Sequence, residues 1–470
     1  MILSKTINKT SLRFVCAECG AVAKKWIGKC IECGAWNSLV EEIVQVRNTK
    51  VPNIINTTLS LDTLISEKNI EVLKITSKIA ELDRVLGGGI VKGSTILIGG
   101  EPGIGKSTLL LQLAAQLSSE RTKSIYISGE ESTEQIRLRA KRLGLAKSPL
   151  HILSATNTTE IIHTLNQIGN IDLVIIDSIQ TMYIEEFSSN PGTVSQIRST
   201  AHEFITLAKK LGIIIIFVGH ITKEGNLAGP KVLEHMVDVV LYFEGNQEHN
   251  FRIIRATKNR FGGVKEIGIF EMAEAGLIEV ANPSSLFLSN MDSSISGSSV
   301  LAAVEGTRAL MVEVQALISA STIAMPRRAV VGWDINRMAM LIAVLQVRYG
   351  LNLNDKEVYL NIVGGLKILE PAADLAITAT LISAATNIVL PEKTIIFGEI
   401  GLAGEVRNVS YADIRLKEAI KLGFRNVIMP KRTKVNNDFN KEISIYEITH
   451  VKQLKGLFDT NFDRAINMEI

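Results

Sequence analysis

The chain has 470 residues, of which 46% are hydrophobic and 21% charged, and its formal net charge is +3. This length is too great for one ordinary domain, and the composition, normal for a soluble protein, supports several buried cores. The positive excess is too small to establish nucleic-acid binding, so any basic surface must be local. The apolar run at 213–219 is too short to span a bilayer, and we see no N-terminal signal segment. We therefore expect a cytoplasmic protein without membrane contact.

Shifts in composition divide the chain into four parts. We predict a small cysteine-containing domain at 1–45 and a polar linker at 46–75. Two larger domains follow at 76–282 and 283–470, with a Ser-, Asn-, Gly- and Pro-containing stretch from Asn282 to Ser299 at their boundary.

All four cysteines lie in two CxxC pairs, Cys16 with Cys19 and Cys30 with Cys33. Each pair lets two thiolates hold one metal from a tight turn, and four sulfur ligands in tetrahedral array suit Zn²⁺. Four protein ligands leave no open position, so the sequence predicts a structural zinc ribbon. A redox dithiol is the alternative.

Tryptophans and lysines surround these pairs. We expect Trp26 and Trp36 to pack inside the small domain rather than to stack on bases. We expect Lys24, Lys25 and Lys29 to form a solvated basic face, with DNA phosphates as the alternative contact.

Apolar segments alternate with helical patterns after the linker. Helices are predicted at Ser107–Leu117 and Gln196–Leu211. The strand candidates are Ser94–Ile98, Ser124–Ser128, Leu173–Ile176, Ile213–Val218, Val237–Phe243 and Arg252–Thr257. This alternation predicts an α/β fold with a mostly parallel sheet covered by helices.

The segment GEPGIGKST follows the first of these strands and precedes a helix. It matches the P-loop pattern, in which backbone N–H groups and a helix N-terminus face nucleotide phosphates. Lys106 is expected to reach the β- and γ-phosphates of ATP, and Ser107 to bind Mg²⁺. The predicted nucleotide-binding residues are Gly100, Glu101, Pro102, Gly103, Ile104, Gly105, Lys106, Ser107 and Thr108.

Polar residues at the ends of three later strands complete the predicted site. Asp177 ends an apolar strand and is expected to hold Mg²⁺ through water. Glu130 and Glu131 follow another strand; we favour Glu130 over Glu131 as the base that activates the attacking water, a choice that geometry must settle, with a helix cap as the alternative role of the pair. His220 is predicted to contact the γ-phosphate and report its loss.

These segments resemble the RecA-type ATPases. The resemblance rests on LDRVLGGGI at 82–90, the P-loop, SGEES at 128–132 and GHITKEG at 219–225. KNRFG at 258–262 is more specific, and together with the four-cysteine ribbon it is similar to a bacterial family of DNA-repair ATPases.

That resemblance implies a hexameric ring that hydrolyses ATP while moving on single-stranded DNA and promotes branch migration of recombination intermediates. Its implied partners are single-stranded and branched DNA and a RecA-type recombinase. An ATP-clamped strand-pairing recombinase, or an accessory factor without motor activity, is the alternative. Lys258 and Arg260 would act catalytically across a subunit boundary, as arginine fingers do, or would simply be basic residues that end a strand. The predicted finger or DNA-binding residues are Lys223, Lys231, Lys258, Asn259, Arg260, Phe261 and Gly262.

The C-terminal domain resembles the catalytic domain of the Lon protease at 364–375 and 397–407. In the protease a serine nucleophile follows the corresponding proline, whereas Pro371 is followed here by two alanines. A Ser–Lys dyad cannot work without the serine, so no protease activity is predicted, although Lys417 lies in the region of the base. Four arginines are expected to be scattered and solvated, with a DNA or ring contact as the alternative: Arg327, Arg328, Arg337 and Arg348.

Overall fold

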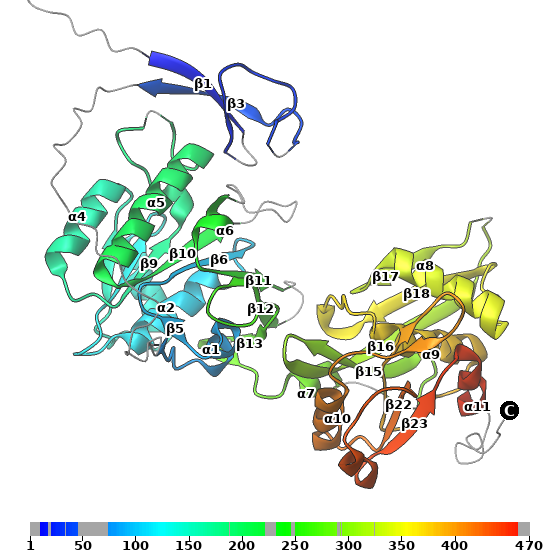
Figure 1. The fold of residues 1–470 in the computed structure, drawn as a ribbon. Coiled ribbons are helices and arrows are strands. Elements are labelled where there is room, and N and C mark those ends of the chain that lie inside the picture. The colour runs from blue at the N-terminus through cyan, green and yellow to red at the C-terminus, as the bar shows by residue number, and fades with distance from the viewer. Residues whose placement is uncertain are drawn as a thin grey trace, which may run out of the picture. The chain divides into compact units, whose positions relative to one another are not determined.

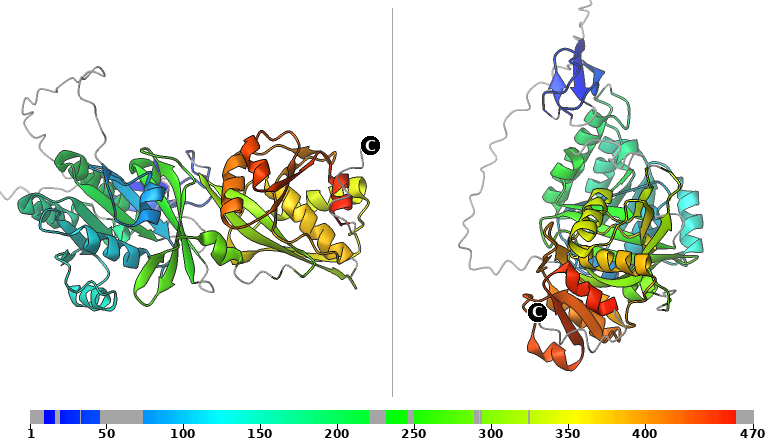
Figure 2. Two further views of the ribbon diagram at one scale, coloured as in Figure 1. Left: turned by 90° about the horizontal axis from the view of Figure 1, so that it is seen from below. Right: turned by 90° about the vertical axis from the view of Figure 1, so that its right-hand side faces the viewer.

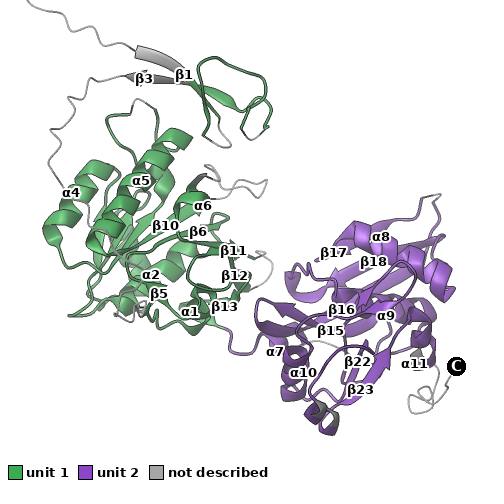
Figure 3. Ribbon diagram, in the orientation of Figure 1, with its two compact units in different colours: residues 1–279 green, residues 280–470 purple. Residues whose placement is uncertain are grey.

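The computed structural model describes residues 10–16, 20–32, 34–45, 74–187, 189–220, 232–245, 250–288, 292, 294–323 and 325–458. The chain divides into two compact units, Met1–Glu279 and Val280–Ile470 (Figure 3). The residue boundaries of the four parts expected from composition stay a prediction.

A small three-stranded antiparallel sheet begins the first unit, drawn in blue in Figure 1. Its order is β2-β1-β3, and its strands are β1 (Thr10–Cys16), β2 (Val22–Ala23) and β3 (Leu39–Gln45). Its buried hydrophobic cluster consists of Cys16, Cys30 and Leu39 among the residues described there. Domains below about 40 residues usually need a metal, a disulfide or a partner to fold, so this cluster alone does not account for the sheet.

The rest of the first unit is built on a nine-stranded sheet with the order β14-β13-β12-β11-β6-β10-β9-β7-β8. Its strands are β6 (Thr95–Gly100), β7 (Ser124–Ser128), β8 (His151–Ser154), β9 (Leu173–Asp177), β10 (Ile214–His220), β11 (Val239–Glu244), β12 (Phe251–Asn259), β13 (Ile267–Ala273) and β14 (Gly276–Glu279). The strands from β11 to β8 are parallel, while β12, β13 and β14 add an antiparallel edge. The predicted, mostly parallel sheet is confirmed.

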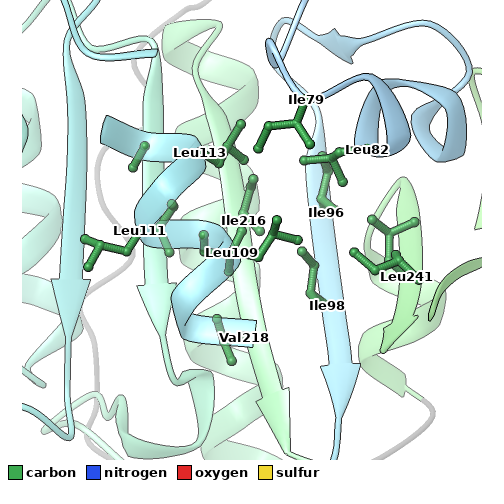
Figure 4. Close-up of a cluster of buried hydrophobic side chains, with 14 of the residues drawn as sticks. Ile79, Leu82, Ile96, Ile98, Leu109, Leu111, Leu113, Ile216, Val218 and Leu241 are labelled. Carbon is green, nitrogen blue, oxygen red and sulfur yellow. The ribbon is translucent and has the colours of Figure 1, made fainter. Parts of the chain in front are cut away.

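Helices cover both faces of this sheet (Figures 1 and 2). The helices α1 (Ala80–Leu86), α2 (Lys106–Leu117) and α3 (Thr133–Arg142) contribute to one core, and α4 (Thr158–Ile168), α5 (Val194–Leu211) and α6 (Val232–Met236) to the other. Successive strand residues alternate between the cores: Ile96 and Ile98 pack with α2 (Figure 4), and Leu97 packs on the opposite face. This is the period of two that a strand buried on both faces requires.

Strand register brings the predicted site residues to one edge of the sheet. Ser128 pairs with Asp177 across β7 and β9, and His220 pairs with Gly100 across β10 and β6. These four residues end their strands, and parallel strands end at the same edge. The P-loop, Glu130, Asp177 and His220 therefore meet there, although they are far apart in the sequence.

The second unit has a seven-stranded mixed sheet with the order β17-β18-β16-β15-β19-β22-β23. The strands are β15 (Ser298–Glu305), β16 (Arg308–Ala320), β17 (Arg328–Val331), β18 (Lys356–Ile362), β19 (Thr394–Ile396), β22 (Asn426–Pro430) and β23 (Ser444–Ile448), with a separate hairpin of β20 (Glu399–Ile400) and β21 (Val406–Arg407). The helices are α7 (Pro283–Leu288), α8 (Ile335–Val344), α9 (Ala373–Thr386), α10 (Ala412–Lys421) and α11 (Leu454–Phe458). The predicted second α/β domain is confirmed.

Helix α9 is the apolar segment that the sequence interrupts with hydroxyl residues. It is buried over most of its length, and two of its hydroxyls have local acceptors: Thr380 donates to the carbonyl of Ala376 at 2.8 Å and Ser383 to that of Ile388 at 2.6 Å. The apolar segment is therefore a packed helix. No helix among the described residues is long and apolar enough to cross a membrane.

Candidate nucleotide site

The P-loop runs from the end of β6 to the start of α2. Gly105 caps α2 with a φ of 117°, a conformation that favours glycine. A Cβ at this position would lie 2.8 Å from Cε of Met272, so space as well as backbone geometry requires glycine. The exposed residues Glu101, Pro102 and Gly103 leave the mouth of the loop open to solvent. The helix N-terminus and the loop backbone thus offer N–H groups to an anion.

Lys106 is the first residue of α2 and is 4% exposed. Its ammonium donates to the carbonyl oxygens of Gly100 and Glu101, both at 2.8 Å. Burial lowers the pKa of Lys106 to about 8, because the charges of Asp177, Glu130 and Glu101 offset only part of the desolvation. These charges show that the predicted site residues converge on one ammonium group.

Glu130 lies just beyond the end of β7. Its Oε1 accepts a hydrogen bond from Ser178 Oγ at 2.6 Å and lies 3.1 Å from His220 Nε2. Burial alone would raise the pKa of Glu130, but hydrogen bonds from Ser178 and His220 and the charges of His220 and Lys106 outweigh it and lower the pKa. A lowered pKa keeps this carboxylate ionised at neutral pH, as a proton acceptor must be.

Gly129 allows the approach of Glu130. Its N–H donates to the carbonyl of Asp177 at 2.8 Å, and a Cβ there would lie 2.0 Å from Thr181 Oγ1. A side chain at Gly129 would therefore push β7 away from the turn η1 (Ile179–Thr181) that follows Asp177.

Glu131 points to different partners from those of Glu130. Its carboxylate pairs with Arg139 of α3, with contacts of 2.8 and 3.1 Å. The structure therefore brings Glu130 to Ser178 and His220, whereas Glu131 holds α3. This geometry favours Glu130 in the choice that the sequence left open.

Asp177 is 6% exposed, and one of its carboxylate oxygens accepts a short hydrogen bond from the hydroxyl of the fully buried Tyr126. Burial, with the charge of Asp177 as the second cause, raises the pKa of Tyr126 well above its usual range. Arg139 donates to the same hydroxyl at 3.3 Å. Tyr126 is thus a permanent donor that orients Asp177.

Sequence analysis missed four residues that support this site: Ser178, Tyr126, Arg139 and Arg252. Arg252 of β12 donates from Nε to the carbonyl of Ile104 in the P-loop at 3.2 Å. Only Ser178 had a local signal, since it follows the strand-ending aspartate. Tyr126 lies on the strand beside β9, Arg139 on helix α3, and Arg252 on β12, two strands from β6, so their contacts depend on how the elements are arranged around the sheet.

Lys258 and Arg260 lie at the opposite end of the sheet from the P-loop of their own chain. Lys258 pairs with Val240, which pairs with Leu97 near the start of β6. Because β6 ends at Gly100, Lys258 is about 10 Å below the P-loop along the strand direction. The pair is therefore not brought together with Lys106.

Both cations have partners within the chain. Lys258 Nζ donates to the carbonyls of Glu234, His235 and Val237 at 2.8, 3.1 and 2.8 Å, at the C-terminal end of α6. Burial and then the charge of Arg260 lower the pKa of Lys258. The side chain of Arg260 is 55% exposed and lies 3.2 Å from Asp238.

The neighbouring residues of the KNRFG segment brace α1. Asn259 donates to the carbonyl of Val85 at 3.4 Å and accepts from the N–H of Phe261 at 2.9 Å. A Cβ on Gly262 would lie 3.0 Å from the Cα of Gly87. DNA contact by this segment stays a prediction, and Lys223 and Lys231 lie outside the described residues.

Cys16 and Cys30 of the ribbon begin two equivalent turns. Cys16 accepts from the N–H of Gly20 and donates its own to Ala21, at 2.8 and 2.9 Å. Cys30 has the same bonds to the corresponding residues of its turn, at 2.9 and 2.8 Å. Cys19 and Cys33 lie outside the described residues, so the tetrahedral set is not described as a whole. Two matched turns with buried cysteines nevertheless fit a metal held by four thiolates.

The expectation that Trp26 and Trp36 pack inside the ribbon is wrong. Their exposed fractions are 55% and 72%. The buried cluster of the ribbon is formed instead by Cys16, Cys30 and Leu39.

In the second unit, two ion pairs occupy the region where Lon-type proteases carry their nucleophile. Arg415 of α10 is 1% exposed and pairs with Glu370 at 2.6 Å. Arg337 donates from Nε to the fully buried Asp374 at 2.6 Å, so its expected place in a scattered solvated set is wrong. Lys417 is exposed.

Comparisons with known proteins find similarity to three stretches of the chain and to full-length relatives. Family models match at residues 63–226 (AAA domain), 14–41 (rubredoxin metal binding domain) and 312–433 (subunit ChlI of Mg-chelatase). The chain is 52% identical to the DNA repair protein RadA of Rickettsia bellii, over 97% of this chain and all of that protein. It is 49% identical to the DNA repair protein RadA of Bacillus subtilis, over 90% of this chain and 93% of that protein.

Among solved structures, a KaiC-like protein of Pyrococcus horikoshii is similar to 44% of this chain over 99% of its own length, with 20% identity and a TM-score of 0.37. The match to full-length relatives is far stronger, and it spans the ribbon, the P-loop unit and the C-terminal unit together. The chain belongs to the RadA family of DNA repair proteins.

Proposed function

We propose that this protein is a DNA-dependent ATPase of recombinational DNA repair. It moves on single-stranded DNA as a hexameric ring and promotes branch migration of recombination intermediates, with branched DNA and a RecA-type recombinase as partners, in the cytoplasm. The observation that carries the proposal is the convergence of Lys106, Glu130, Asp177 and His220 at one edge of the sheet.

Each residue has a distinct task in hydrolysis. Lys106 and the P-loop backbone hold the phosphates of ATP, and Ser107 and Asp177 hold Mg²⁺, which neutralises charge on the transferred phosphoryl group. Glu130 accepts a proton from the attacking water. His220, hydrogen-bonded to Glu130 and at the end of β10, links the state of the γ-phosphate to the segment that follows it.

Lys258 and Arg260 act on the nucleotide of a neighbouring subunit. Their position at the far end of the sheet from their own P-loop supports this task, because a cation there cannot serve its own site without crossing the sheet. A cation supplied across a subunit boundary stabilises the charge of phosphoryl transfer. Lys258 must then leave the α6 carbonyls when the neighbour binds.

The other parts of the chain support the motor. Zn²⁺ held by Cys16, Cys19, Cys30 and Cys33 stabilises the ribbon. The C-terminal unit has no protease activity, because Ala372 carries no nucleophilic oxygen and the buried cation of α10 is already paired with Glu370.

The test is ATP hydrolysis by the full chain with and without single-stranded DNA, comparing the native protein with Lys258→Ala. The proposal predicts strong stimulation by DNA, which the substitution abolishes while nucleotide binding is kept. Lys417→Ala, at an exposed position of the C-terminal unit, is the basic control and keeps the stimulation. Hydrolysis indifferent to DNA would favour an accessory factor; DNA binding that depends on ATP without repeated turnover would favour a strand-pairing recombinase.

A further inference from the structure

We propose that the two exposed tryptophans of the ribbon, with the lysines beside them, form a stacking surface for single-stranded DNA. We call Trp26, Trp36, Lys24, Lys25 and Lys29 the tryptophan surface. The inference deepens the proposed function by giving the ribbon a direct contact with the DNA strand, and it rests on that function.

The two indole rings lie beside one glycine. A Cβ at Gly28 would be 3.8 Å from Cη2 of Trp26 and 3.9 Å from Cζ3 of Trp36. The edges of both rings thus approach the same point on the chain. Gly28 leaves that point without a side chain, so the rings flank a shallow, open position.

Backbone pairing fixes this arrangement. Lys29 and Trp36 form an antiparallel bridge, and the N–H of Asn37 donates to the carbonyl of Gly28 at 2.8 Å. Cys30 directly follows Lys29 of this bridge. The N–H of Cys30 donates to the carbonyl of Ala35 at 2.8 Å and so extends the pairing into the cysteine turn. The tryptophan surface is therefore built on the turn that begins at Cys30. Its geometry depends on the same contacts that hold this turn.

Leaving these rings in water has no folding purpose. The ribbon buries Cys16, Cys30 and Leu39, while Trp26 and Trp36 remain 55% and 72% exposed. A tryptophan stabilises a fold chiefly by burying its large apolar area. Exposed apolar rings that gather on one small domain mark an interaction surface.

The charge beside the rings favours a nucleic acid as the occupant. Lys24, Lys25 and Lys29 are all exposed, and Lys29 Nζ lies 5.5 Å from the ring centroid of Trp36. Aromatic faces with adjacent lysines are the combination that binds single strands, because bases stack on the rings while phosphates pair with the cations. A duplex keeps its bases stacked inside, so the surface selects single-stranded DNA.

The experiment separates base stacking from phosphate contact. The full-length, zinc-loaded protein is titrated with a short dT oligomer and with an abasic oligomer of the same length, without nucleotide. The native chain is compared with a Trp26→Ala/Trp36→Ala double variant. The double variant is expected to bind the dT oligomer about tenfold more weakly and the abasic oligomer unchanged, since stacking contributes in this range for each base.

Fluorescence gives a second, local readout. The chain has three tryptophans, so Trp333→Phe leaves Trp26 and Trp36 as the indoles that report. Their emission is expected to fall on binding the dT oligomer and to stay unchanged with the abasic oligomer. Lys29→Gln is expected to weaken binding of both oligomers equally, because it removes a phosphate contact alone.

Control variants keep the test decisive. Trp26→Phe/Trp36→Phe retains flat rings and should keep most of the preference for bases, with an unchanged zinc content. If the alanine variant loses zinc, binding of the two oligomers by the phenylalanine and Lys29→Gln variants tests the inference instead. An unchanged preference for the dT oligomer in the alanine variant overturns the inference. This holds even if the same variant no longer responds to a recombinase, because the surface would then bind a protein and not DNA. A native chain that binds neither oligomer, with ATP or without it, would instead defeat the proposed function.

Discussion

At the scale of single residues, the nucleotide site depends on how two adjacent glutamates are divided between tasks. Glu130 contacts Ser178 and His220, and Glu131 contacts Arg139. The two carboxylates thus face different partners, as expected if Glu130 serves the proposed reaction and Glu131 the fold.

Glu130→Gln is expected to reduce ATP hydrolysis about 10²- to 10⁴-fold, the usual contribution of a general base, with ATP binding retained. Glu131→Gln is the matched control and should keep most of the hydrolysis. Steady-state hydrolysis and binding of a fluorescent ATP analogue measure the two quantities. Equal losses in both variants would contradict the assignment.

Lys106 gives the site a pH dependence. Its pKa of about 8 in the nucleotide-free chain is lower than usual because of burial, so it is charged below pH 8 and becomes neutral above it. Bound phosphates favour the charged form. ATP affinity is therefore expected to fall as pH rises above 8, about fivefold between pH 8 and 9, with proton uptake on binding.

Calorimetry in buffers of different ionisation enthalpy measures this uptake. Lys106→Met should bind ATP weakly at every pH and take up no proton. Proton uptake of the same size in that variant would assign the titration to another group.

Tyr126→Phe removes one hydroxyl and leaves the ring. Asp177 then loses the donor that orients it, and the Mg²⁺ concentration for half-maximal hydrolysis should rise about tenfold, as for other groups that support a metal ligand. ATP binding in the presence of a chelator should not change. An unchanged Mg²⁺ midpoint would show that the hydroxyl serves only the core.

The sequence predicted the residues that face the nucleotide but not those that hold them. The P-loop and Asp177 are recognisable because their chemistry demands a local pattern. Tyr126 acts from the strand beside β9 and Arg252 from two strands away from β6, and one-dimensional spacing contains no information on the order of strands in a sheet. Trp26 and Trp36 were misjudged because apolar character predicts burial only on average.

At the scale of elements, most predicted strands and helices agree with the structure to within a few residues. The strands β13 and β14 were not predicted, because they follow β12 as an antiparallel edge rather than alternating with helices. Helix α9 starts two residues after Pro371, as a proline just before an apolar run favours.

The ion pair between Arg415 and Glu370 fixes α10 to the segment before α9. Removing one partner leaves a buried charge, so Arg415→Met should lower the free energy of unfolding of the C-terminal unit by about 3–5 kcal/mol. Lys417→Met, on the same helix but exposed, should change it by less than about 0.5 kcal/mol.

Urea unfolding of the full chain, followed by a probe in the C-terminal unit, makes this comparison. Adding Glu370→Gln to Arg415→Met should recover part of the loss, because an amide costs less to bury than an unpaired carboxylate. Equal effects of the Arg415 and Lys417 substitutions would contradict a stabilising role for the pair.

At the scale of the whole molecule, the proposed function joins two groups of residues that lie at opposite ends of one sheet. Lys106, Glu130 and Asp177 lie at the carboxyl edge, and Lys258 and Arg260 lie at the other. In the proposed ring, Lys258 and Arg260 of one subunit face the P-loop of its neighbour. The proposed hydrolysis therefore requires assembled subunits.

Hydrolysis by mixed rings tests this central claim most directly. Lys106→Ala chains keep Lys258 but cannot hold phosphates, and Lys258→Ala chains keep the P-loop but lack the finger. Each variant alone should be inactive. Rings co-assembled from both, and purified through a different tag on each chain, should hydrolyse ATP in the presence of single-stranded DNA, because some interfaces join an intact P-loop to an intact Lys258. Mixed rings as inactive as either variant alone, beside native chains treated in the same way, would contradict action across subunits.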